Sequence, residues 1–213
     1  MKTIQTENGP DLAVVIGGSD AETLAMPGLS ILLCPVEEAS WNKDLSPWPA
    51  EPIFRGAPPF AGGADAYFES LLPVIRPALE THSGAHYLCG YSLAGLFAIY
   101  TCTNYDLFDG CVSASGSLWY PGWTEWLSDH PVQCSRVYLS LGEQEKHTKH
   151  ALMKTVEERT RQSEAMIGKY AETVFELNEG GHFADEDARL AKGLAWLCRS
   201  RGFTEITAQN QEG

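Results

Sequence analysis

The chain has 213 residues, of which 44% are apolar, and its 28 acidic and 15 basic side chains give a formal net charge of −13. A chain of this length and composition can bury a full hydrophobic core. The charge argues against a nucleic-acid partner and against an anionic membrane surface, because both are recognised mainly by clustered cationic side chains. We therefore expect a globular protein with neither partner.

The first ten residues, MKTIQTENGP, lack the apolar core of a signal peptide, and no uninterrupted apolar stretch is long enough to span a bilayer. These features predict a cytoplasmic protein without a membrane segment. Cys34 and Cys89 lie within apolar runs, and none of the six cysteines forms a CxxC pair. We expect buried free thiols rather than a disulfide framework.

Short apolar runs predict the strands of a parallel sheet. Their hydrophobicity is continuous rather than alternating, which is typical of strands covered on both faces. The runs are LAVVIGG (12–18), SILLCPV (30–36), HYLCG (86–90), GCVSAS (110–115), RVYLSLG (136–142) and TVFELN (173–178). They predict a mostly parallel sheet of about six strands.

Helical patterns alternate with these runs. One begins near Asp65, a plausible N-cap, and we expect Pro73 and Pro77 to kink or shorten it. Others cover residues 93–100, 148–170 and 185–200, the last ending near Gly202. The alternation predicts a single α/β domain over residues 1–213, with helices flanking the sheet and a polar tail after about residue 203.

One connection is too long for an ordinary loop. The segment WNKDLSPWPAEPIFRGAPPFAGG, residues 41–63, is rich in proline and aromatic residues. Loops of this length inside a compact domain usually serve a function. We interpret the segment as a substrate-facing loop, with packing over a sheet edge as the alternative.

The stretch HYLCGYSLAG places Ser92 where a predicted strand gives way to a predicted helix. A nucleophilic serine on such a sharp turn requires small neighbours, and Gly90, Ala94 and Gly95 supply them. The same turn leaves the backbone N–H of Leu93 at a helix N-terminus, free to bind an oxyanion. A plain helix-capping serine is the alternative interpretation.

A serine hydroxyl needs a base, and the base needs an acceptor for its second ring nitrogen. His182 follows the last predicted strand after two glycines, which favours it over the other histidines. Glu145 and Glu143 both follow the strand run that ends at Gly142. We prefer Glu145, because Glu143 comes directly after the tight turn.

A metal site is a weaker interpretation of the same segment, which contains Glu143, Glu145, His147 and His150. Two lysines are interleaved with these residues and the HExxH pattern is absent. Neither a P-loop nor a GxGxxG turn opens a helix, so nucleotide cofactors also lack support. The sequence predicts neither a metal nor a cofactor.

The order Ser92, Glu145, His182 is the order of α/β-hydrolases. Together with the motifs DLSPWP, GYSLAGLF, SGSLWYPG, SLGEQE and GGHF, it makes the chain from Leu12 to about Arg201 resemble the small bacterial esterases of that superfamily. The resemblance implies an α/β-hydrolase fold and serine-ester chemistry, with Ser92 as nucleophile and His182 as base. Two departures are Ala94 in place of the usual second glycine and glutamate where aspartate is commoner. Some relatives work with a Ser-His pair alone.

The remaining site residues are assigned by position. The second oxyanion donor should follow the first long strand, where we choose the N–H of Gly18 over that of Gly17. Trp119, Tyr120 and Trp123 lie in SGSLWYPGWTEW, after the strand that follows the Ser92 helix, and could line a substrate pocket. Covering the sheet edge is their alternative role.

These observations predict a cofactor-free serine hydrolase, a carboxylesterase acting on a small or medium acyl ester through an acyl-enzyme. A thioesterase, an acyltransferase or a peptidase would use the same residues. A binding protein that keeps the fold but has lost turnover is the alternative from another class. The oligomeric state does not follow from the sequence.

Overall fold

The computed structural model describes residues 4–54 and 56–199. A seven-stranded sheet has the order β1-β3-β2-β6-β7-β8-β9, and all neighbours are parallel except β1 (Ile4–Thr6), which pairs antiparallel with β3 at the edge. The six parallel strands are β2 (Asp11–Ile16), β3 (Leu29–Cys34), β6 (His86–Tyr91), β7 (Gly110–Ala114), β8 (Arg136–Gly142) and β9 (Glu172–Asn178). Each coincides with one predicted run, so the mostly parallel α/β fold is confirmed.

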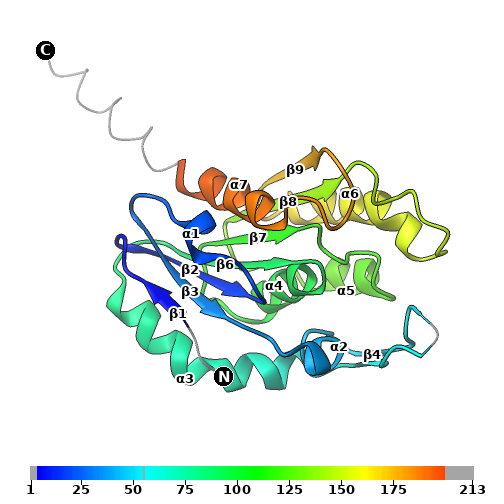
Figure 1. The fold of residues 1–213 in the computed structure, drawn as a ribbon, viewed down its shortest axis with the longest axis horizontal. Coiled ribbons are helices and arrows are strands. Elements are labelled where there is room, and N and C mark those ends of the chain that lie inside the picture. The colour runs from blue at the N-terminus through cyan, green and yellow to red at the C-terminus, as the bar shows by residue number, and fades with distance from the viewer. Residues whose placement is uncertain (1–3, 55, 200–213) are drawn as a thin grey trace, which may run out of the picture.

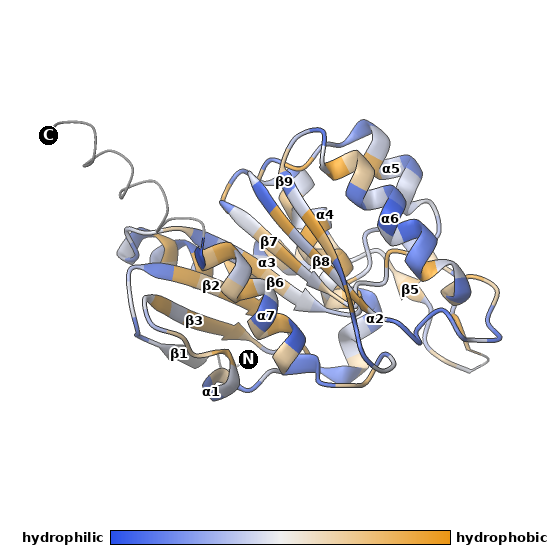
Figure 2. Ribbon diagram, turned by 90° about the horizontal axis from the view of Figure 1, so that it is seen from above, coloured by the Kyte–Doolittle hydropathy of each residue, from blue (hydrophilic) through white to orange (hydrophobic). Residues whose placement is uncertain are grey.

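Helices cover both faces of the sheet (Figure 1). One face packs against α3 (Ala64–Thr81), α4 (Leu93–Asn104), α5 (Trp123–Asp129) and α6 (Val156–Ile167), and the other against α1 (Ala21–Leu24) and α7 (Glu186–Arg199). Continuous hydrophobicity in the strands follows from this double coverage, and Figure 2 shows apolar residues along the central strands. The core therefore lies in two layers, one on each side of the sheet.

The prolines of α3 do not shorten it as expected. The helix runs from Ala64 through Pro73 and Pro77 to Thr81. The two prolines are four residues apart and both are exposed, which places them on the solvent-facing side of the helix, where water can satisfy carbonyls that lose an N–H partner. The N-cap is Gly63, and Asp65 lies inside the first turn, where its carboxylate accepts a hydrogen bond from the Tyr100 hydroxyl.

The helix expected over residues 148–170 is shorter. It consists of a 3-10 turn, η2 (Met153–Thr155), followed by α6, which ends before Gly168. Helix α4 is longer than expected and is buried almost throughout, so it shows little of the periodicity that marks a helix in sequence. The expected helix end near Gly202 and the polar tail lie outside the described residues.

Several short elements were not predicted. They are β1, α1 and α5, together with η1 (Glu38–Ser40), α2 (Trp41–Asp44), β4 (Pro49–Ala50) and β5 (Phe60–Ala61). The last four lie in or beside the long 41–63 segment, where β4 and β5 form a two-stranded antiparallel pair. Elements this short carry too few residues to show a period.

None of the six cysteines, which all lie among the described residues, is in a disulfide, and five of them are buried. In the part of the chain that the structure describes, no helix is long and apolar enough to cross a membrane. The carboxyl ends of β6, β8 and β9 meet at one edge of the sheet. Ser92, Glu145 and His182 follow these three strands, so the topology brings them to the same edge.

Candidate active site

Ser92 occupies a strained turn between β6 and α4. Its backbone has φ 57° and ψ −122°, a region that residues other than glycine rarely adopt. Neighbouring segments hold it there: its N–H donates to Ala114 O at 3.0 Å, and its C=O accepts from Ser117 N at 3.0 Å. The turn is so tight that a Cβ at Gly90 would lie 2.1 Å from Ala94 O. Gly90 must therefore be glycine.

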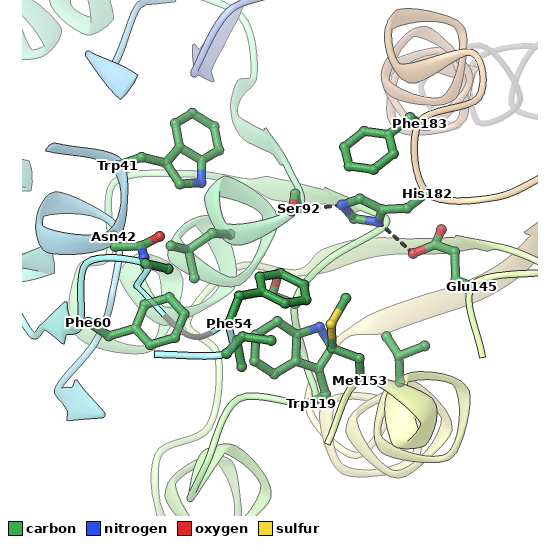
Figure 3. Close-up of a pocket in the computed structure, with 15 residues that line it drawn as sticks. Trp41, Asn42, Phe54, Phe60, Ser92, Trp119, Glu145, Met153, His182 and Phe183 are labelled. Carbon is green, nitrogen blue, oxygen red and sulfur yellow. Dashed lines mark hydrogen bonds and ion pairs between the residues drawn. The ribbon is translucent and has the colours of Figure 1, made fainter. Parts of the chain in front are cut away.

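His182 lies against the Ser92 hydroxyl. Its Nε2 is 2.9 Å from Ser92 Oγ, and its Nδ1 is 2.7 Å from Glu145 Oε2 (Figure 3). Gly180, at φ 87°, turns the chain after β9, and the Tyr91 hydroxyl donates to the His182 carbonyl at 2.6 Å. The imidazole is thus held between the hydroxyl and the carboxylate.

The Glu145 carboxylate is almost fully buried, with 5% of its side chain exposed. Its Oε1 accepts hydrogen bonds from Gly142 N at 2.6 Å and from Ser115 Oγ at 2.7 Å. Burial is the largest influence on its pKa and raises it, but the hydrogen bonds from His182, Gly142 and Ser115 and the charge of His182 together hold the pKa below its usual value. Glu145 is therefore ionised at neutral pH.

Glu143 does not share this position. Its side chain is exposed, and its N–H donates to Asn178 O at 2.9 Å, which fixes the turn after β8. The structure thus brings Glu145 to His182 and leaves Glu143 outside. Among the described residues, no group of three or more His, Cys, Asp or Glu side chains is arranged to hold a metal ion.

Arg189 connects the segments that carry the site, and the sequence did not single it out. This side chain of α7 is 3% exposed. Its Nη1 donates to Glu145 Oε1 at 3.2 Å, to Ser115 Oγ at 2.8 Å and to the Tyr91 hydroxyl at 3.1 Å. Its Nη2 donates to the carbonyls of Glu179 at 2.9 Å and Gly181 at 3.0 Å. One guanidinium therefore joins the Glu145 carboxylate, the Ser92 strand and the loop that carries His182.

The sequence predicts the backbone N–H groups of Leu93 and Gly18 as oxyanion donors, with Gly17 as the alternative to Gly18. Leu93 begins α4, so its N–H has no acceptor within the helix. Gly17 is engaged, because its N–H donates to Cys34 O at 3.0 Å. Gly17 and Gly18 both line a cavity together with Ser92 and His182, so the engaged N–H of Gly17 is what distinguishes the two. Of the two glycines considered from sequence, the geometry favours Gly18.

A cavity of about 300 Å³, here called the aromatic cavity, opens beside Ser92 (Figure 3). The 41–63 segment contributes a large part of its wall, so this segment faces the cavity beside Ser92. The lining residues are Trp41, Asn42, Ile53, Phe54, Ala57, Phe60, Ser92, Leu93, Ser117, Trp119, Glu145, Met153, Val156, His182 and Phe183.

Of the three aromatic residues proposed for the pocket, Trp119 lines this cavity. Tyr120 does not; it is buried and its hydroxyl donates to Trp48 O at 2.6 Å. Trp123 is also buried, and its Nε1 donates to Ser163 Oγ at 3.0 Å between α5 and α6. Both rings belong to the hydrophobic core and neither lines the cavity, so the structure does not support a substrate contact by Tyr120 or Trp123.

A comparison with protein families shows to which family this chain belongs. Residues 26–188 match the family described as "Putative esterase". The chain belongs to this esterase family. A curated relative, uncharacterized protein YbbA of Bacillus subtilis (strain 168), is 23% identical over 141 residues. That match covers 62% of this chain and only 56% of the relative's length.

Solved structures share the α/β-hydrolase fold at low identity. An IroE-like serine hydrolase from Shewanella oneidensis has a TM-score of 0.73 and 16% identity, and the match covers 89% of this chain and 70% of the hydrolase chain. Siderophore hydrolase EstA from Aspergillus nidulans has a TM-score of 0.66 and 19% identity, and the match covers 89% of this chain and 82% of the EstA chain. The enterobactin esterase FES from Shigella flexneri has a TM-score of 0.63 and 21% identity, and the match covers 92% of this chain and 54% of the FES chain.

Proposed function

We propose that this esterase-family member is a serine carboxylesterase that works through Ser92, His182 and Glu145. The observation that carries the proposal is the continuous line of contacts, 2.9 Å from Ser92 Oγ to His182 Nε2 and 2.7 Å from His182 Nδ1 to Glu145 Oε2, at the wall of an open cavity. A hydroxyl, an imidazole and an ionised carboxylate in this order form the apparatus of nucleophilic acyl transfer.

The proposed reaction has two halves. His182 Nε2 takes the Ser92 proton while Oγ attacks the ester carbonyl, and the N–H groups of Leu93 and Gly18 bind the oxyanion that forms. The intermediate collapses when His182 returns the proton to the leaving alcohol, which leaves an acyl-Ser92 ester. Water then attacks this ester by the same route and releases the acid. Glu145 holds the imidazole tautomer and stabilises its charged form.

All of these groups come from the chain itself, so the proposed reaction requires no cofactor. Residues that follow β2, β6, β8 and β9 of the one sheet come together at this site, and we propose that residues 1–213 act as one domain. The cytoplasmic location expected from the sequence is part of the same proposal.

The volume and lining of the aromatic cavity favour a small or medium acyl ester. About 300 Å³ lined mainly by apolar side chains accommodates one short chain or one ring. Two of the similar structures are a siderophore hydrolase and an enterobactin esterase. Among the described residues that line this cavity there is no lysine or arginine, and a polyanionic ester would find no cationic partner among them.

Labelling with a fluorophosphonate tests the serine chemistry directly. We expect one covalent adduct per chain, located on Ser92 by mass spectrometry of peptides, and none in Ser92→Ala. A His182→Gln variant should be labelled far more slowly, because the hydroxyl loses its base. Wild-type protein that is folded but stays unlabelled would contradict the proposal and favour a binding protein.

A further inference from the structure

Two cavities meet at Ser92. Besides the aromatic cavity there is a second one of about 210 Å³, here called the acidic cavity, which is also lined by Gly18, Tyr91 and Glu186. Trp41, Ser92, His182 and Phe183 line both cavities. Because the two cavities share the proposed nucleophile and base, an ester whose carbonyl carbon lies at Ser92 can extend one arm into each.

The two cavities differ in chemistry. The aromatic cavity is walled mainly by indole, phenyl and aliphatic groups, and its one carboxylate, Glu145, is engaged by His182, Ser115 and Arg189. The acidic cavity has the Glu186 carboxylate, which is exposed at the first turn of α7. No lysine or arginine occurs among the described residues that line either cavity. Among the described lining residues, Glu186 is therefore the one acidic side chain that is exposed to solvent, and it belongs to the acidic cavity.

Two aromatic rings accompany this carboxylate. The Trp41 ring packs over Gly17, where an added Cβ would lie 3.3 Å from the indole. Phe183 is 85% exposed, with its ring centroid 5.0 Å from that of His182. Figure 3 shows Trp41 and Phe183 on opposite sides of Ser92, to its left and to its right in the upper half of the view. Both rings line the acidic cavity, so a ligand in that cavity can contact them.

Aromatic faces combined with a carboxylate form a site for an organic cation. The ring quadrupole attracts a quaternary or alkylated ammonium group, and such a group sheds its water more readily than an inorganic ion. The whole chain, with a formal net charge of −13, adds long-range attraction for cations. Cavity, rings, carboxylate and overall charge all favour the same ligand class.

We propose, on the basis of the proposed esterase function, that the substrate is a cationic ester. Its compact apolar arm occupies the aromatic cavity, and its other arm carries an alkylated ammonium group into the acidic cavity, against Trp41, Phe183 and Glu186. The carbonyl between them lies at Ser92.

Matched esters of the same shape test this proposal. The first pair varies the alcohol arm: butyrylcholine carries a trimethylammonium group, and 3,3-dimethylbutyl butyrate carries a neutral group of the same shape. The second pair varies the acyl arm in the same way: it consists of the p-nitrophenyl esters of betaine, which is charged, and of 3,3-dimethylbutanoic acid, which is neutral. We would measure kcat/KM for both pairs with wild type, Glu186→Gln and Glu69→Gln. Glu69 is exposed on α3 and lines neither cavity, so its variant removes the same charge elsewhere. Comparing variants cancels the intrinsic reactivity of each ester.

For the pair whose charge enters the acidic cavity, we expect Glu186→Gln to lower the cationic-to-neutral ratio of kcat/KM by about two- to fivefold. Glu69→Gln should keep the wild-type ratio. Equal ratios in all three proteins for both pairs, with neutral esters still hydrolysed, would overturn the cationic class and leave the esterase function standing. Folded protein that hydrolyses none of the four esters and reacts with no fluorophosphonate would overturn both.

Discussion

Arg189 is buried away from the cavity walls, so the role that follows from its contacts is positioning. Its five hydrogen bonds join the Glu145 carboxylate, Ser115, Tyr91 and two carbonyls of the loop before His182. A lysine has one nitrogen and cannot reach all of these groups from a single position. The guanidinium group therefore fixes the Glu145 carboxylate and the loop before His182 relative to each other.

We expect Arg189→Lys to lower kcat by about tenfold or more while KM changes little, because the residue lines neither cavity. Arg189→Met should also lower the free energy of unfolding by about 3–5 kcal/mol, since it leaves the buried Glu145 charge without its cation. Steady-state kinetics and urea unfolding measure the two effects. A rise in KM at constant kcat would assign Arg189 to substrate binding instead.

Glu145 and Glu143 provide a matched pair. Glu145→Gln removes the acceptor charge beside His182 and should lower kcat by on the order of 10²–10⁴-fold. Glu143→Gln, at an exposed position, should leave kcat within about twofold. The opposite ranking would mean that the acid is misassigned, and two small effects would indicate a Ser-His pair.

The stability of the fold should depend on the same carboxylate. The folded-state pKa of Glu145 lies below its ordinary value of 4.5, so ionised Glu145 stabilises the fold above that pH, and this contribution is lost as the pH falls through the folded pKa. The difference in unfolding free energy between wild type and Glu145→Gln should therefore shrink between neutral pH and about pH 4 and below. Urea unfolding at several pH values measures it, and a difference that is constant with pH would contradict the assignment.

At the scale of elements, the segment from β7 to α5 contains one tryptophan that lines a cavity and one that packs in the core. Trp119 lines the aromatic cavity, whereas Trp123 is buried between α5 and α6 with its Nε1 bonded to Ser163. The sequence could not separate them, because both lie in one aromatic stretch and burial depends on how α5 docks.

Trp119→Ala should therefore shift the preference among acetate, butyrate and octanoate esters toward longer acyl chains, because it enlarges the cavity. Trp123→Ala should instead lower the free energy of unfolding by about 3–5 kcal/mol and leave the preference unchanged. Chain-length profiles and urea unfolding of both variants provide the comparison. An altered profile in Trp123→Ala alone would reverse the two assignments.

At the scale of the whole molecule, the parallel sheet was predictable because each of its six strands is a continuous apolar run. The same reasoning placed Ser92, Glu145 and His182 together, since residues after parallel strands share one sheet edge. Strand β1 is short and lies at the edge, so it shows no such run. Arg189 was not predictable either, because an arginine on an amphipathic helix is usually a surface charge, and its burial depends on a partner 44 residues away.

The most direct test of serine-ester chemistry is hydrolysis of p-nitrophenyl acetate, butyrate and octanoate by wild type and Ser92→Ala, with the folding of both verified by circular dichroism. We predict measurable wild-type turnover that falls below detection in Ser92→Ala, since loss of a triad nucleophile can cost on the order of 10⁶ in kcat. Turnover that survives in Ser92→Ala, or that never occurs in folded wild-type protein, would contradict the assignment of Ser92 as the nucleophile.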